Sequence, residues 1–517
     1  MPEKQEEMGT VVSNLEGPSP SQVDFVVLNG KVHRGQFVEI PYSEGTLMGM
    51  VSNVLKTNKY FERADAVKEF EAQGTKLFEQ FPVHDWEYVM AQTVPLGVFV
   101  ENRFKRTTFP PSPGSKVYNA NAEHIRKFLG LDEEKGLQLG TLEFHPVEVK
   151  LNLSKLLQKH LAILAMSGAG KSHTVSCLLE ELLSRKKEHG RVAIVAFDVH
   201  GEYTNFAEPV TDEKYTDYSS QTRLIRARDL RIGVPKVSLG TFSALLPNAS
   251  PAQKRELGKV IQHLQQKMKD GQGPYDLNDI RHALVDELNG KDAKESVITA
   301  LIGWLHELED LQLFGKADNP ALLDLVQPGV LTVVDLSDII HQHKKQVIVA
   351  YLSQRLFYER RSKKIPPVTI VLEEAHNFIP NQSSKNESIA KGIMRTIARE
   401  GRKFGVSLCL ISQRPIQLDT TTLSQCNTQL LLRITNPYDI KHIGESAEGL
   451  SAESLGMLTA LKVGEGLLIG EAVNAPTFFK VRQRKSQPSR HEGSLEHAAQ
   501  SYEENEAKNR KETEDLL

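Results

Sequence analysis

The chain has 517 residues, of which 39% are hydrophobic and 25% are charged, and its formal net charge at pH 7 is −3. This is the composition of a globular protein too long for one ordinary hydrophobic core, so two or three domains are expected. The slightly negative charge excludes a strongly basic nucleic-acid binder. It does not exclude a DNA motor, because basic loops that line a channel can be local and masked in the total.

The cysteines and the N-terminus indicate a reducing compartment. Cys177, Cys409 and Cys426 are scattered without metal-ligand spacing, which argues against a disulfide or zinc framework. The charged N-terminus lacks the apolar segment of a secretion signal, and no run of about 18 apolar residues occurs. We therefore expect a cytoplasmic protein with no membrane partner.

The first part of the chain is expected to be rich in β-structure. Residues 1–20 are polar and are predicted to be a disordered lead. Residues 21–150 contain β-rich runs, which predict a small β-barrel or sandwich with one helix near residues 63–80; the runs are 23–28, 36–40, 47–51 and 87–91. Asn29-Gly30, between the first two runs, is typical of a hairpin turn.

The pattern changes after residue 150. Residues 151–245 and 321–482 predict the two parts of an α/β core with a parallel sheet, whose candidate strands are 161–165, 192–198, 331–336, 368–372, 406–412 and 430–434. Residues 246–320 show helical spacing and predict an inserted helical bundle with two apolar core stripes, Leu257, Ile261, Leu264 and Met268, and then Ile298, Leu301, Leu305 and Leu308. Residues 483–517 are expected to be a charged tail, either disordered or a solvated helix.

Residues 165–172 carry the strongest functional signal. They read Ala-Met-Ser-Gly-Ala-Gly-Lys-Ser and lie between a buried strand and a helix, the arrangement that cradles nucleotide phosphates. We expect Lys171 to reach the β- and γ-phosphates and the Ser172 hydroxyl to ligate Mg²⁺. The expected ATP contacts are Ser167, Gly168, Ala169, Gly170, Lys171, Ser172 and His173.

A pair of acids supplies the other half of the expected site. Glu373 and Glu374 end an apolar strand. The first carboxylate is expected to hold Mg²⁺ and the second to act as the catalytic base that polarises the attacking water, although paired acids at a strand end can also simply cap the next helix. Asp198 ends another strand and is a second candidate for the metal and water network, with a loop-capping role as its alternative.

Three further residues are candidates for catalysis. In a RecA-like strand order, Gln413 would lie beside the γ-phosphate and sense hydrolysis, unless it is only a turn-forming residue before Pro415. Arg399 and Arg402 are candidates for an arginine that a neighbouring subunit supplies to the phosphoryl-transfer transition state. A solvated basic helix surface is the alternative for both, and Arg433 competes for the same role.

The motifs together resemble the HerA family. They are Gly168-Ala169-Gly170-Lys171-Ser172, Asp198-Val199-His200-Gly201-Glu202-Tyr203, Glu373-Glu374-Ala375-His376-Asn377, Arg399-Glu400-Gly401-Arg402-Lys403-Phe404-Gly405, Ser412-Gln413-Arg414-Pro415 and Ser424-Gln425-Cys426-Asn427-Thr428. Ala165 and Val199 depart from the family pattern, which often has glycine and proline there.

The resemblance implies a RecA-like P-loop ATPase core with an N-terminal β-barrel, assembled as a homohexamer. It further implies an ATP- and Mg²⁺-dependent translocase or helicase on double-stranded DNA. The expected setting is DNA end resection for recombinational repair with a NurA-type nuclease. Two alternatives stay open: a ring ATPase that handles proteins in secretion or remodelling, and a nucleotide-dependent regulatory partner of a nuclease with little motor activity.

Overall fold

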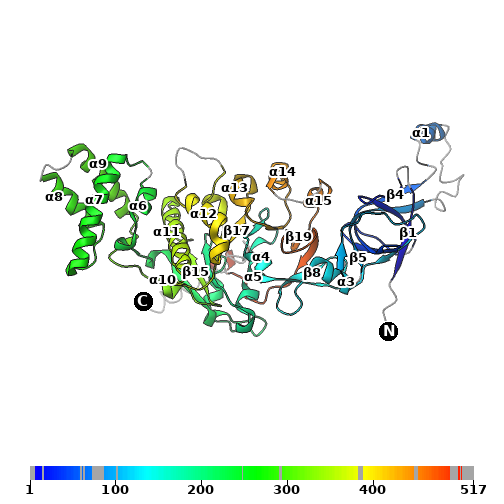
Figure 1. Cartoon of the computed structure of the whole chain (residues 1–517), viewed down its shortest axis with the longest axis horizontal. Coiled ribbons are helices and arrows are strands. Elements are labelled where there is room, and N and C mark those ends of the chain that lie inside the picture. Colours follow the sequence, from blue (N-terminus) through cyan, green and yellow to red (C-terminus); the bar gives the residue numbers. More distant parts are fainter. Residues whose placement is uncertain are drawn as a thin grey trace. The chain divides into compact units, whose positions relative to one another are not determined.

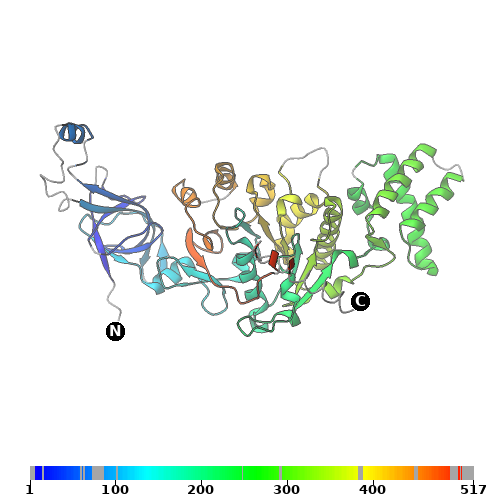
Figure 2. The ribbon, with the colours of Figure 1, turned by 180° about the vertical axis from the view of Figure 1, so that it is seen from behind.

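The computed structural model describes residues 6–13, 17–28, 30–58, 61, 64–72, 87–100, 103–246, 248–289, 294–381, 388–446, 452–489, 496, 499–500 and 502–503. The chain forms two compact units (Figures 1 and 2). The first unit comprises Met1–Lys155 and Gln429–Arg482, and the second comprises Leu156–Thr428 and Gln483–Leu517. Across the described residues, no helix is both long and apolar enough to cross a membrane.

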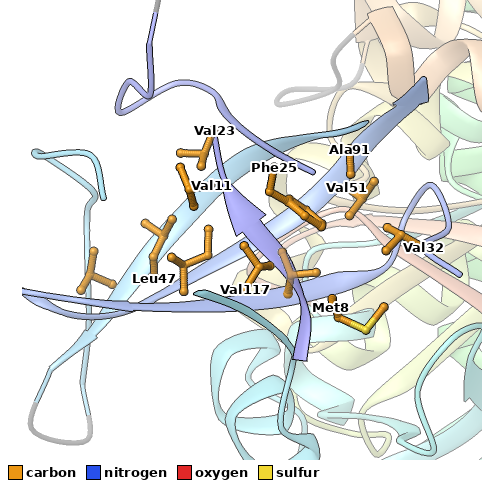
Figure 3. Packing of buried hydrophobic residues seen from close by; sticks show 12 residues of the cluster. Met8, Val11, Val23, Phe25, Val32, Leu47, Val51, Ala91 and Val117 are labelled. Carbon is orange, nitrogen blue, oxygen red and sulfur yellow. The ribbon is translucent and has the colours of Figure 1, made fainter. Parts of the chain in front are cut away.

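The first unit contains the expected β-barrel. Its strands are β1 (Glu7–Val11), β2 (Val23–Val27), β3 (Phe37–Tyr42), β4 (Gly45–Asn58), β5 (Glu87–Val100), β6 (Arg103–Lys105) and β7 (Lys116–Asn119). They follow the order β2-β1-β7-β3-β4-β5-β6, and β2 also pairs with β5, which closes the sheet. Alternate residues of these strands point inward and fill the barrel with aliphatic side chains around Phe25 (Figure 3).

Two predictions about this region are wrong. Part of the predicted disordered lead is strand β1, because Met8 and Val11 are each 2% exposed in the barrel core and the strand pairs with β2 and β7. The predicted hairpin fails because β2 and β3 are not neighbours in the sheet; Asn29 itself lies outside the described residues. The predicted helix is present as α1 (Ala64–Ala72), and residues 73–80 lie outside the described part.

The first unit also contains strands from both ends of the sequence. These are β8 (Leu137–Leu142), β9 (Glu148–Leu151), β18 (Thr428–Leu431), β19 (Glu465–Gly470) and β20 (Thr477–Val481). Antiparallel pairing joins β19 to β20, β20 to β8, and β8 to β9. The structure divides the chain after residues 155, 428 and 482, and residues 429–482, which were expected in the second part of the α/β core, group with the N-terminal part of the chain. The helices here are α3 (Ala122–Leu129), α4 (Leu153–Leu157), α14 (Pro437–Ser446) and α15 (Ala452–Met457).

A parallel sheet forms the centre of the second unit. Its strands are β10 (Leu161–Leu164), β11 (Ala193–Asp198), β12 (Thr222–Arg226), β15 (Leu331–Asp335), β16 (Val368–Leu372) and β17 (Val406–Ser412). Their order is β12-β15-β11-β16-β17-β10, and each pairing is parallel. These strands read as continuous apolar runs because helices cover the sheet; among them α11 (Gln342–Arg361) and α12 (Ile389–Phe404) lie side by side against β17 (Figure 1). Five of the six candidate strands are confirmed in this parallel sheet. The sixth, 430–434, corresponds to β18 (Thr428–Leu431), most of which belongs to the first unit.

The predicted helical insertion is also present, as α6 (Leu239–Leu245), α7 (Pro251–Lys267), α8 (Leu277–Asn289) and α9 (Glu295–Asp310) (Figure 2). Helix α7 begins with a capping box, in which Ser250 and Gln253 satisfy each other's backbone N–H groups, and Pro251 occupies its first turn. The predicted stripes are buried, from Leu257 to Leu264 and from Ile298 to Leu308, while Met268 is half-buried.

Short elements connect the larger ones. They are β13 (Ile232–Gly233), β14 (Phe314–Gly315), α10 (Leu322–Leu325), α13 (Thr420–Leu423), the π turn η8 (Met268–Gln272) and the 3₁₀ turns η3 (Lys187–His189), η4 (Thr204–Ala207), η5 (Ser219–Gln221), η6 (Ala227–Asp229), η7 (Val234–Lys236), η9 (Ala375–Asn377) and η10 (Pro415–Gln417).

The start of the predicted tail is ordered against α5 (Lys171–Leu183). The fully buried Glu180 carboxylate of this helix accepts hydrogen bonds from the Lys485 and Ser486 backbone N–H groups, at 2.9 and 2.8 Å, and from the Ser486 hydroxyl at 2.7 Å. The prediction of a disordered or solvated tail is therefore wrong for residues 483–489, because a buried carboxylate needs such donors.

Candidate nucleotide site

The phosphate loop joins β10 to α5 as the sequence predicts. Gly168 and Gly170 have φ angles of 76° and 95°, in the left-handed region that favours glycine. Gly170 is the N-cap of α5 and supplies no side-chain cap, so the N–H groups of the first helical turn can face an anion. Ser167 and Gly168 are exposed at the loop tip, Ala169 is buried, and Lys171, Ser172 and His173 are half-buried.

The phosphate-loop lysine and the expected catalytic base meet directly. The Lys171 ammonium lies 2.5 Å from Glu374 Oε1, and their side chains are 10% and 2% exposed. Glu374 follows β16 with φ of 47°, an unfavourable angle for a residue with a side chain, which costs about 1–3 kcal/mol. Strain of this kind is often kept where a side chain must point in one direction, and here it places a carboxylate beside the phosphate loop.

Glu374 is also linked to the end of β17. The His376 Nδ1 atom lies 3.3 Å from Glu374 Oε2 and 3.0 Å from the Ser412 hydroxyl, and burial lowers the pKa of His376. Gln413, half-buried, follows Ser412. Because β17 lies between β16 and β10, the strand order that was expected for Gln413 is confirmed.

Asp198 and Glu373 mainly organise the loop after β11. Asp198 accepts hydrogen bonds from the backbone N–H groups of Gly201, Glu202 and Tyr203 at 2.8–3.0 Å. Glu373 Oε2 accepts from the Val199 and His200 N–H groups at 2.8 and 3.2 Å. The capping role left open for Asp198 is therefore what its contacts show.

The sequence places Glu202 just beyond the end of a strand but assigns it no role, and the structure brings it to the phosphate loop. The Ser172 hydroxyl donates a hydrogen bond of 2.5 Å to Glu202 Oε2. The available signal was its position four residues beyond the end of β11, at the edge where parallel sheets bind ligands.

The acids near Ser172 fit a hard cation such as Mg²⁺. Burial, together with Asp198 and Glu202, raises the pKa of Glu373 well above its ordinary value, and burial also raises that of Asp198. Glu373 Oε1 is buried without a hydrogen-bond donor, so a proton or a nearby cation must neutralise the negative charge of this carboxylate. No three metal-binding side chains among the described residues form a complete cage. Mg²⁺ binds proteins through one or two carboxylates together with waters and substrate phosphates.

The candidate arginines stand apart from this cluster. Arg399 and Arg402 are exposed on α12, and within the described part of the chain neither contacts Lys171 or Glu374. Arg433 follows β18 in the first unit, and its Nε atom is buried without an acceptor. Within the described part of the second unit, neither Arg399 nor Arg402 therefore reaches the phosphate loop.

Comparison with known proteins finds similarity to HerA helicases. A family model described as "Helicase HerA, central domain" matches residues 137–356. A probable helicase of Methanocaldococcus jannaschii is 29% identical over 473 residues, which cover 86% of each chain. Over most of its length the chain is thus similar to HerA helicases. The DNA double-strand break repair helicase HerA of Saccharolobus solfataricus is 29% identical over 495 residues, covering 91% of this chain and 92% of that protein.

A solved structure supports the fold assignment. VirB4 of Thermoanaerobacter pseudethanolicus matches with a TM-score of 0.50 at 17% sequence identity, over 68% of this chain and 97% of that one. The expected fold class, a P-loop ATPase core with an N-terminal β-barrel and inserted helices, is confirmed.

Proposed function

We propose that this chain is an ATP-driven translocase or helicase on double-stranded DNA. The observation that carries the proposal is the direct contact between Lys171 of the phosphate loop and Glu374 at the end of β16. A phosphate-binding cation and a water-polarising carboxylate in one pocket are the parts that ATP hydrolysis requires. Similar proteins named as DNA double-strand break repair helicases support DNA as the substrate along which this motor would move.

ATP binding would rearrange the observed contacts. Lys171 would leave Glu374 for the β- and γ-phosphates, which frees the carboxylate to accept a proton from the attacking water. The loop from Ser167 to His173 would hold the phosphates through backbone N–H groups. Gln413 would sense the γ-phosphate and pass its loss on to Ser412 and His376.

Residues at the site would also hold Mg²⁺. The Ser172 hydroxyl and the carboxylates near it carry oxygen donors of the kind that the cation prefers. When bound, Mg²⁺ neutralises charge that develops on the phosphate oxygens. Glu373 and Asp198 keep the loop after β11 in the shape that presents the remaining oxygens.

We further propose that six copies of the chain form a ring in which Arg399 or Arg402 of one subunit completes the site of the next. Their exposure on α12 supports this, because an arginine that acts on a neighbour must be free of its own chain. In this proposal the ring works in the cytoplasm with a NurA-type nuclease in DNA end resection for recombinational repair.

The ATPase rate with and without linear double-stranded DNA tests the proposal. DNA should stimulate the wild-type rate, and Lys171→Ala and Glu374→Gln should each lose roughly 10²- to 10⁴-fold. Glu188→Gln, which removes an exposed carboxylate on η3, is the matched control and should retain the wild-type rate. Full activity of Glu374→Gln would remove the base assignment.

DNA binding separates this function from a protein-handling ring ATPase. A DNA motor should bind duplex DNA with an affinity that falls steeply with salt, because phosphate contacts release counterions. Failure to bind DNA at low salt would favour the protein-handling motor. For the arginines, mixed rings of Lys171→Ala and Arg399→Ala or Arg402→Ala subunits should recover part of the activity if the arginine acts on a neighbour. Absence of recovery would make the arginine structural.

A further inference from the structure

The loop that follows β11 presents one acid to the phosphate loop and uses two others to hold its own shape. Both oxygens of Asp198 are occupied by backbone donors, Oδ1 by Gly201 and Glu202, and Oδ2 by Tyr203. A carboxylate that accepts three backbone N–H groups has little capacity left for a metal ion. The three hydrogen bonds that Asp198 accepts therefore fix the backbone of the loop after β11.

Glu373 contributes to the same loop from β16. Its Oε2 accepts the Val199 and His200 N–H groups, so its position is set by the loop backbone. Its second oxygen is buried without a donor, and both Asp198 and Glu202 lie close enough to raise its pKa. One oxygen of Glu373 therefore accepts hydrogen bonds from the loop backbone, and the carboxylate lies near the other two acids.

Glu202 differs from both acids. It is half-buried, and its carboxylate reaches the Ser172 hydroxyl, the group expected to ligate Mg²⁺, at 2.5 Å. The neighbouring Tyr203 is fully buried, and the Gly201 carbonyl accepts hydrogen bonds from the Thr204 and Ser489 hydroxyls. The backbone on both sides of Glu202 is thus fixed, which presents its side chain in one direction.

We propose that Glu202 is the carboxylate that, with Ser172, holds the hydrated Mg²⁺ of the bound nucleotide, while Asp198 and Glu373 act as positioning residues. This inference rests on the proposed nucleotide binding and changes the sequence-based assignment, which gave the metal to Asp198 and Glu373. The physical reason is the availability of lone pairs: Glu202 offers oxygens that no backbone N–H group occupies among its observed contacts, and Mg²⁺-bound water requires such acceptors.

The test measures how Mg²⁺ changes the affinity for a fluorescent, non-hydrolysable ATP analogue. Glu202→Gln should raise the Mg²⁺ concentration for half-maximal enhancement on the order of 10- to 100-fold, as loss of an outer ligand does, and binding in EDTA should stay at the wild-type level. Glu373→Gln keeps an amide oxygen that can accept from Val199 and His200, so its Mg²⁺ dependence should stay close to wild type. Glu188→Gln is again the surface control.

Three results would overturn the proposal. They are a wild-type Mg²⁺ response in Glu202→Gln, a Glu373→Gln shift as large as that of Glu202→Gln, and loss of EDTA binding in Glu202→Gln. The last result would assign Glu202 to the phosphate loop itself. Failure of the proposed function is distinguishable, because wild-type protein that binds the analogue with Mg²⁺ but hydrolyses no ATP on DNA would refute the motor and leave the Glu202 assignment standing.

Discussion

Acidification should destabilise the second unit through His160. This residue precedes β10 and is 2% exposed. Its Nδ1 atom accepts the Leu408 N–H at 3.0 Å, and its Nε2 atom lies 3.0 Å from the Ala398 carbonyl, to which it donates. This pattern requires a neutral ring. Burial accordingly lowers the pKa of His160 from 6.5 to about 4.

The free energy of unfolding falls on acidification because the unfolded chain binds a proton at His160 more readily than the folded chain does. Because the folded pKa is the lower one, the stabilising effect of the neutral ring is complete above pH 6.5 and is lost as the pH falls toward 4. Between about pH 7.5 and 5, a shift of this size removes about 2 kcal/mol from the free energy of unfolding.

The variant His160→Asn isolates this effect. Asparagine tolerates the φ angle of 65° at this position and can still accept the Leu408 N–H, but it does not titrate. The difference in unfolding free energy between wild type and variant, measured by urea denaturation, should shrink by about 2 kcal/mol at about pH 5 relative to pH 7.5. The exposed His343→Asn is the control for the chemical change from histidine to asparagine at the surface. A constant difference for His160→Asn would refute the reasoning.

Three further substitutions test other contacts. Glu180→Ala should lower the free energy of unfolding by about 3 kcal/mol in urea denaturation, because the Lys485 and Ser486 N–H groups and the buried Ser486 hydroxyl lose their acceptor; a cost below about 1 kcal/mol would contradict this role. Gly170→Ala should lower the free energy of unfolding by about 1–2 kcal/mol in urea denaturation and weaken binding of the ATP analogue, since alanine disfavours φ of 95°. Unchanged affinity would show that the loop tolerates alanine at this position. Asp419→Ala should lower the free energy of unfolding by about 2 kcal/mol in urea denaturation, because the buried Thr422 N–H and hydroxyl lose their acceptor and the partly exposed Arg395 loses its bidentate partner at 2.6 and 3.1 Å; a neutral result would mean that water replaces the carboxylate.

The local parts of the nucleotide site could be predicted from the sequence. Gly168 and Gly170 mark a loop that needs left-handed backbone, and Lys171 with Ser172 follows at the position where a helix begins. The apolar run before Glu373 predicts β16 with its observed bounds, since a strand covered on both faces is continuously hydrophobic. These features depend on neighbours in the sequence, so a local pattern is sufficient to find them.

Contacts between distant segments were decided only by the tertiary structure. The sequence around β1 is polar and gives no strand pattern. The segment is nevertheless a barrel strand, because it pairs with β2 and β7 on its two edges and buries Met8 and Val11. Likewise, the acids at 198, 202 and 373 look equivalent in sequence, and their roles separate only when backbone N–H groups occupy two of them and Ser172 meets the third. A buried site contains few hydrogen-bond donors. The fold determines which carboxylate accepts a hydrogen bond from each of them.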